Sequence, residues 1–117
     1  MNENNALVVF QDKKIRRIWH ENEWYFSVVD VIEALTESDN PRNYWNMLKV
    51  RELEHGIELS TFCVQLKLES LDGKRYETDC ANTESIFRLV QSIPSRKAEP
   101  FKLWLAQVGY ERVQEIE

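Results

Sequence analysis

The fold of this chain is decided by residues 27–51, which read SVVDVIEALTESDNPRNYWNMLKVR. Ser27 is a residue type that caps helices, and Asp30, three residues later, suits the positive end of a helix dipole. Apolar residues then recur at helical spacing: Val28, Val31, Ile32 and Leu35. The polar stretch 36–40 ends this helix, and Pro41 favours the first turn of another. The pattern therefore predicts two helices joined by a turn.

The second of these helices carries a polar sector that suggests DNA binding. At about 100° per residue, its apolar side is formed by Tyr44 and Leu48, flanked by Trp45 and Met47. A helix of such a pair can enter the major groove and contact bases. Candidate DNA contacts are Arg42, Asn43, Asn46 and Lys49, with Arg96 and Lys97 as phosphate contacts near the start of the last helix. The same pattern also fits an ordinary amphipathic helix whose polar side is solvated.

Three short segments rich in β-branched and aromatic residues precede the helices and predict an antiparallel meander: 7–10, 15–20 and 24–26. The pattern leaves open which face of the second strand is buried, because Ile15 and Trp19 share one face while Ile18 lies on the other. Arg16 and Arg17 are interpreted as solvated charges, with phosphate contact as the lesser alternative.

The clearest β signal lies at 62–80, where apolar and polar residues alternate on both sides of a turn. A two-residue loop would place Leu68 opposite Glu77, whereas a three-residue loop places Leu68 opposite Tyr76. A slip of one residue would move the charged residues to the buried face, which is unfavourable. We therefore predict the three-residue loop, with Gly73 in the left-handed conformation.

Two further helices follow this hairpin. Asn82 or Thr83 caps the first of them, and Lys97 starts the second. The apolar face of the second helix is predicted to lie in the core: Phe101, Trp104, Leu105 and Val108. Gly109 interrupts this helix before the segment 111–117. The predicted fold class is α+β: a small antiparallel β-meander, a helix-turn-helix-like pair, a β-hairpin and two C-terminal helices in one domain.

The bulk properties describe one acidic globular domain of 117 residues with a net charge of −5. No apolar run approaches the roughly 20 residues of a membrane span, and the N-terminus lacks the regions of a signal peptide, so we expect a cytoplasmic protein without a membrane partner. In the predicted hairpin Cys80 faces in and Cys63 faces out, which argues against a disulfide. The negative charge disfavours a strongly basic nucleic-acid module but allows a local basic patch.

Motifs for catalysis are missing from the sequence. There is no nucleophile elbow, phosphate-binding glycine loop or metal-spaced set of cysteine and histidine. The histidines, His20 and His55, are far apart along the chain. We therefore expect a non-enzymatic protein that uses neither a cofactor nor a metal ion.

The order of these features resembles the Bro-N domain, the N-terminal domain of baculovirus BRO proteins and of many phage antirepressors. The signature of an aromatic residue, a small residue, two variable positions, Asp and Val is matched by WYFSVVDV at 24–31. Further segments lie where the family has comparable ones: IR at 15–16, NTESIFRL at 82–89 and SRKAEPFKLW at 95–104. The end, WLAQVGYERV at 104–113, is most similar to the bacterial DNA-damage-inducible D proteins, because Val-Gly-Tyr replaces the family's usual Val-Leu-Pro.

This resemblance implies an α+β domain tied to DNA binding and to phage or stress-response regulation, as the N-terminal part of a longer protein. It supplies no catalytic residues. Two hypotheses follow: a regulatory DNA-binding domain, or a protein-interaction module that binds a repressor or a DNA-repair protein without contacting DNA. The oligomeric state is open, with a homodimer as one option. The hypotheses separate on salt, because affinity for DNA falls steeply as ionic strength rises.

Overall fold

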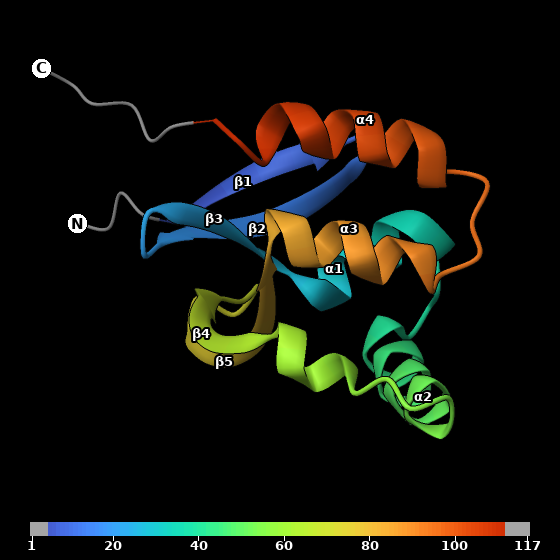
Figure 1. Ribbon diagram of the computed structural model, residues 1–117. Helices are drawn as coiled ribbons and strands as arrows, with labels where there is room; N and C mark the ends of the chain where they lie inside the picture. Colours follow the sequence, from blue (N-terminus) through green and yellow to red (C-terminus); the bar gives the residue numbers. More distant parts are fainter. Residues whose placement is uncertain (1–4, 112–117) are drawn as a thin grey trace, which may run out of the picture.

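The computed structural model describes residues 5–111 and has the predicted α+β architecture (Figure 1). Five strands form one antiparallel sheet in the order β1-β2-β3-β5-β4. The strands are β1 (Asn5–Phe10), β2 (Lys13–His20), β3 (Glu23–Ser27), β4 (Val64–Glu69) and β5 (Arg75–Asn82). The helices are α1 (Val28–Thr36), α2 (Pro41–Glu54), the 3-10 helix η1 (Leu59–Phe62), α3 (Thr83–Gln91) and α4 (Ala98–Val108). Almost all of the predicted segment 111–117 lies outside the described residues.

The predicted starts of α1 and α3 are confirmed by their side-chain caps. The Ser27 hydroxyl accepts the backbone N–H of Asp30 at 3.4 Å, which opens α1. The Asn82 side chain, rather than that of Thr83, accepts an N–H at the start of α3. Asn40 caps α2, and Pro41 occupies its first turn. Side-chain oxygens thus satisfy backbone N–H groups that have no partner within the helix.

The predicted hairpin is also confirmed. Leu68 lies opposite Tyr76 and Lys67 lies opposite Glu77, as the three-residue loop requires. Gly73 has a φ of 85°, in the left-handed region that glycine tolerates best. The hairpin extends the meander into a single sheet because β5 pairs with β3.

The helices cover one face of the sheet, and this answers which side of β2 is buried. Ile15 is fully buried on that face and shares the main core with Phe26 of β3. Residues of α1, α3 and α4 belong to the same core, and α3 and α4 lie side by side in Figure 1. The opposite face holds a smaller cluster formed by Tyr25, Leu68 and Cys80, with Ile18 packed against it.

Arg17 is not a solvated charge, so that interpretation is wrong. Its guanidinium lies 3.8 Å from the centre of the Trp24 ring. One of its nitrogens donates to the Val108 carbonyl at 2.8 Å and lies 3.0 Å from a carboxylate oxygen of Glu111. The Trp24 indole N–H donates to the Glu111 carbonyl at 2.9 Å. Arg17 therefore holds the end of α4 against the sheet, because stacking and hydrogen bonds both use its planar guanidinium.

The end of α4 depends on the absence of a side chain at Gly109. A Cβ placed there would lie 2.5 Å from the methyl group of Thr83 and 2.7 Å from the Leu105 carbonyl oxygen. The Thr83 hydroxyl donates to the Gly109 carbonyl at 2.7 Å. Phe101 and Leu105 are fully buried, whereas the predicted core residue Trp104 is only partly buried. No helix in residues 5–111 combines the length and apolar character that crossing a lipid bilayer requires.

Candidate functional site

Helix α2 lies on the side of α3 away from α4 and presents most of its surface to solvent (Figure 1). Trp45 and Leu48 are its buried residues, with 3% and 1% of their surface exposed. Its end is closed by two backbone hydrogen bonds, from Gly56 to the Leu53 carbonyl and from Ile57 to the Glu52 carbonyl. Gly56 has a φ of 83°, so these bonds form the usual left-handed helix end.

The predicted polar sector of α2 divides into two groups. Arg42, Asn43 and Asn46 are exposed, as the prediction required. Lys49 is partly buried, lies 3.7 Å from a carboxylate oxygen of Asp79, and packs 5.0 Å from the centre of the Trp45 ring. Three of the four side chains can reach an external ligand directly, whereas Lys49 already has an anionic partner.

Asp79 on β5 is the centre of the contact between α2 and the hairpin. Its carboxylate accepts hydrogen bonds from the Trp45 indole N–H and from the Gln65 amide, each at 2.8 Å. Burial alone would raise the pKa of Asp79, but these hydrogen bonds and the charge of Lys49 lower it overall. The carboxylate is therefore held ionised next to α2.

A cavity of about 600 Å³ lies between the N-terminal half of α2 and the hairpin, beside the contact with Asp79. Arg42 and Asn46 line it from α2, while Tyr76, Glu77 and Asp79 line it from β5. The polar sector therefore faces two carboxylates across the cavity. A phosphate entering this space would meet their repulsion as well as the attraction of Arg42 and of Arg16, which also lines the cavity but is already paired with Asp30.

The predicted phosphate contacts before α4 also differ from each other. Arg96 is exposed. The Lys97 ammonium pairs with the carboxylate of Glu37 in the α1–α2 turn, and this hydrogen bond lowers the pKa of Glu37. The Ser95 hydroxyl donates to the Leu35 carbonyl at 2.6 Å, which brings the start of α4 against the end of α1. Lys97 is thus a structural tie, and Arg96 remains available.

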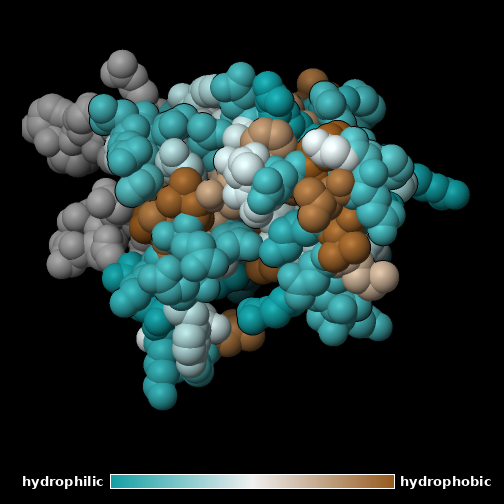
Figure 2. Space-filling model, turned by 60° about the horizontal axis from the view of Figure 1, so that its bottom comes forward, coloured by the Kyte–Doolittle hydropathy of each residue, from teal (hydrophilic) through white to brown (hydrophobic). Residues whose placement is uncertain are grey.

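An apolar face on α2 was missed by the sequence prediction. Met47, assigned to the core side, is 63% exposed, so that assignment is wrong; Val50 and Leu53 are 60% and 58% exposed. Ile57, just after the helix, is 42% exposed. Figure 2 shows apolar surface gathered where α2 lies. The signal was present as three apolar residues spaced three apart, which places them together on a helix surface.

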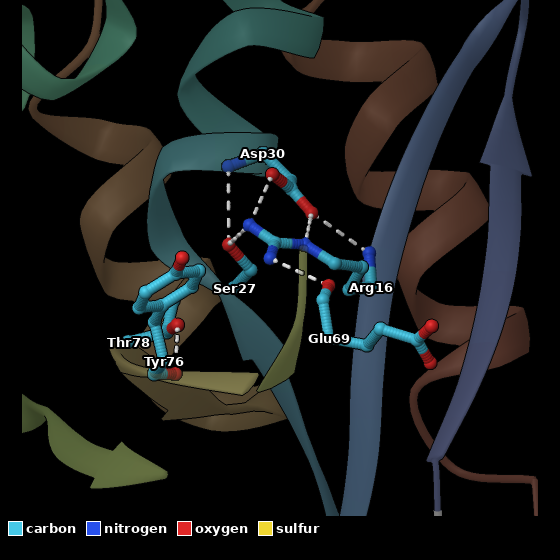
Figure 3. A network of polar contacts seen from close by, with 6 residues as sticks. All are labelled: Arg16, Ser27, Asp30, Glu69, Tyr76 and Thr78. Atoms are coloured by element: carbon cyan, nitrogen blue, oxygen red, sulfur yellow. Dashed lines mark hydrogen bonds and ion pairs between the residues drawn. The ribbon is translucent and has the colours of Figure 1, made fainter. Parts of the chain in front are cut away.

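The Arg16 side chain forms the densest polar network in the described part of the chain (Figure 3). Its Nε and Nη2 donate to the two oxygens of Asp30 at 2.8 and 3.0 Å, and its backbone N–H donates to Asp30 at 2.9 Å. Nη2 also reaches the Ser27 hydroxyl at 3.3 Å, and Nη1 reaches the Glu69 carbonyl at 3.2 Å.

This network corrects the interpretation of Arg16 as a solvated charge. The hydrogen bonds that Arg16 donates to the Asp30 carboxylate raise the pKa of Arg16, so the guanidinium stays charged. Ser27 and Asp30 of the quoted signature are therefore structural residues that join β2 to the first turn of α1. A cavity of about 680 Å³ lies beside the network, lined in part by Leu7, Lys14 and Leu71. The described residues contain no group of three or more histidine, cysteine, aspartate or glutamate side chains placed to hold a metal ion.

Comparison with known protein families shows that residues 14–111 match the N-terminal domain of the BRO family. The match covers β2 from residue 14 onward, the other three strands β3, β4 and β5, and all the helices described above, including the Arg16 network and α2, whereas β1 lies before it. Neither the comparison with curated proteins nor that with solved structures found a match.

Proposed function

The chain belongs to the BRO family, and we propose that its Bro-N domain is a regulatory protein-interaction module whose contact element is α2. The observation that carries this proposal is the apolar face formed by Met47, Val50 and Leu53. Each of these side chains is more than half exposed on the side of the helix opposite its buried residues. Contiguous exposed apolar side chains mark interaction sites in soluble proteins. A helix with such anchors fits an apolar partner surface.

The charges around α2 support a protein partner over a DNA duplex. Lys49 and Lys97 already pair with Asp79 and Glu37, so using them for phosphates requires breaking those contacts. The cavity beside the polar sector carries Glu77 and Asp79 on its other wall. The chain as a whole has a net charge of −5. DNA binding draws most of its affinity from phosphate contacts, and this surface supplies few uncommitted cations.

The partner class that suits this proposal is a repressor or a DNA-repair protein, as the family resemblance implied. The assignment to the damage-inducible branch is part of the same proposal. It draws support from Gly109 in the Val-Gly-Tyr segment, because the contact with Thr83 leaves no room for a side chain there. The role requires binding alone, so the proposal includes no catalytic step, cofactor or metal.

DNA binding is the second candidate, and one observation favours it. Three polar residues are exposed on the first two turns of α2: Arg42, Asn43 and Asn46. Arg96, two residues before the start of α4, is also exposed. Recognition helices contact bases with residues near their N-termini, where Asn pairs with adenine and Arg with guanine or phosphate. In this candidate the apolar face would contact thymine methyl groups.

Fluorescence anisotropy with a mixed-sequence duplex at low and moderate salt separates the two candidates. Wild type is compared with Arg42→Ala/Lys49→Ala and with a matched control, Lys67→Ala/Lys74→Ala, which removes two charges from the hairpin. We expect weak binding that both double variants change equally. A wild-type salt slope that falls by about two units in the α2 variant, and stays unchanged in the hairpin control, would overturn the proposal in favour of DNA.

A further inference from the structure

We infer that the partner seated on α2 is a second copy of this chain, with the two α2 helices packed antiparallel. The inference rests on the proposed function, because it names the occupant of the same apolar face. It differs from the proposal in one respect: the proposal seats a repressor or a DNA-repair protein on α2, whereas the inference seats a second copy there, so that the two partners would compete for this face.

The apolar face is symmetric about Val50. Met47 lies one helical turn before Val50 and Leu53 lies one turn after it, all of them exposed. An antiparallel copy related by a two-fold axis at Val50 places Met47 against Leu53 of the partner subunit. It also places Val50 against the partner's Val50. A two-fold contact of this kind needs a surface that is complementary to itself, and this spacing provides one.

The charges along α2 favour the antiparallel orientation. The helix contains no acidic residue before Glu52, and Arg42 is exposed in its first turn. The other end of the face is acidic, with exposed Glu54 and Glu58. At about 1.5 Å per residue, Asn46 and Glu54 lie about 6 Å on either side of Val50, and Arg42 lies one turn beyond Asn46, whereas Glu58 follows the end of the helix.

An antiparallel partner therefore brings each basic end against an acidic end. The amide of Asn46 would face Glu54 of the partner subunit, where it can donate a hydrogen bond. The helix dipoles also oppose each other in this arrangement, whereas a parallel pair would align them and set like charges together. Arg51, in the last turn, reaches α3, where its guanidinium donates to the Ser92 carbonyl at 3.0 Å, and it lies 3.7 Å from a carboxylate oxygen of Glu52.

The contact uses one helix face from each copy, so we expect a weak, concentration-dependent dimer rather than an obligate one. Arg42, Asn43 and Asn46 would be covered in this dimer. DNA binding by that face and self-association are therefore mutually exclusive, which makes the two testable against each other.

Sedimentation equilibrium of the full chain over a wide concentration range provides the first test. Wild type should show a monomer–dimer equilibrium, and Val50→Glu should stay monomeric at every concentration. Leu71→Glu is the matched control, since Leu71 is a fully exposed leucine at the hairpin tip. Circular dichroism should show both variants folded, because each changes an exposed position. A wild type that is monomeric throughout, or a dimer that survives Val50→Glu, overturns the inference.

A charge exchange tests the orientation. Arg42→Glu alone, and Glu54→Arg/Glu58→Arg alone, should each weaken the dimer by about fivefold or more, because like charges then face each other at both ends. An equimolar mixture of the two variants should recover dimers, since the acidic α2 of one variant then meets the basic α2 of the other. The orientation is read from Arg42→Glu alone, because a parallel pair would already set Arg42 against Arg42 and would not be weakened by the change. A dimer that Arg42→Glu leaves unweakened overturns the antiparallel pairing. A monomeric wild type that also lacks salt-dependent DNA affinity would end the inference while leaving the proposed function intact.

Discussion

Asp30→Ala should remove the main polar connection between β2 and α1. The substitution deletes three hydrogen bonds, from the backbone N–H, Nε and Nη2 of Arg16. The two side chains are only 26% and 14% exposed, so water cannot fully replace the lost contacts. We expect the free energy of unfolding to fall by about 3 kcal/mol, beyond the value of a surface ion pair. For a domain of this size the melting temperature should drop by roughly 10 °C.

Urea unfolding followed by tryptophan fluorescence and by circular dichroism measures this loss. Glu33→Ala is the control, because it removes a carboxylate one turn further along α1, beside the same cavity. We expect the control to change the free energy of unfolding by less than about 0.5 kcal/mol. A double-mutant cycle with Arg16→Ala should show strong coupling to Asp30. An Asp30→Ala variant as stable as the control, or a coupling energy near zero, would refute the structural role of the network.

Three further predictions concern other parts of the fold. Gly109→Ala should lower the free energy of unfolding by about 2 kcal/mol, because the added methyl group crowds Thr83. Adding Thr83→Ser to this variant should recover part of the loss in the same urea assay. A Gly109→Ala variant as stable as wild type would show that the contact with Thr83 is loose. Trp104→Ala should lower the free energy of unfolding by about 2–3 kcal/mol, which is less than the loss expected for a fully buried tryptophan because the ring is partly exposed. The substitution also removes the hydrogen bond from the indole N–H to the Val9 carbonyl at 2.9 Å, and the melting temperature measures the effect. Asp79→Asn should weaken the dependence of stability on acid pH. The pKa of Asp79 is lowered in the folded state, so the ionised carboxylate stabilises the fold at pH values above the ordinary carboxyl pKa of about 4. This contribution is lost as the pH falls below that value and the carboxylate is protonated. Urea unfolding of wild type and Asp79→Asn at several pH values measures this difference. An equal dependence of stability on pH in both proteins would show that the contact of Asp79 with α2 does not stabilise the fold.

The features that were predictable from sequence depend on short stretches of chain. Ser27 and Asn82 were identified as caps because a cap needs only the next three residues. The hairpin register followed from the alternation of apolar and charged residues around Gly73, which admits one pairing without burying charge. Local geometry decides these features, and the sequence contains all of it.

The features that were not predictable depend on contacts between distant segments. Arg16 and Arg17 are adjacent on a strand, and their neighbours within the meander favoured solvation. Their partners are Asp30 in α1 and Glu111 just after α4, and the strand pattern does not specify where these segments lie. The joining of β3 to β5 is a pairing of this kind as well.

The candidate site was predictable in part. Helical periodicity correctly placed Arg42 and Asn46 at the surface. Helical periodicity could not decide which apolar side of α2 is buried, because the helix has apolar residues on two sides. The Trp45 indole binds Asp79 on β5, which fixes that side as the buried one and turns Met47 outward. A hydrogen bond between residues 34 positions apart therefore decides which apolar side of α2 is free.

Nitrogen-15 NMR of the full chain tests the central claim most directly, because it reports every backbone amide in one experiment. Spectra are recorded while the protein concentration is raised, and again while duplex DNA is added at moderate salt. If the outward apolar face of α2 is the contact surface, the amide chemical shifts of Met47, Val50 and Leu53 should change with protein concentration. Adding DNA should change them little. Shifts at Arg42, Asn43 and Asn46 that appear on adding DNA, without any response to protein concentration, would contradict it.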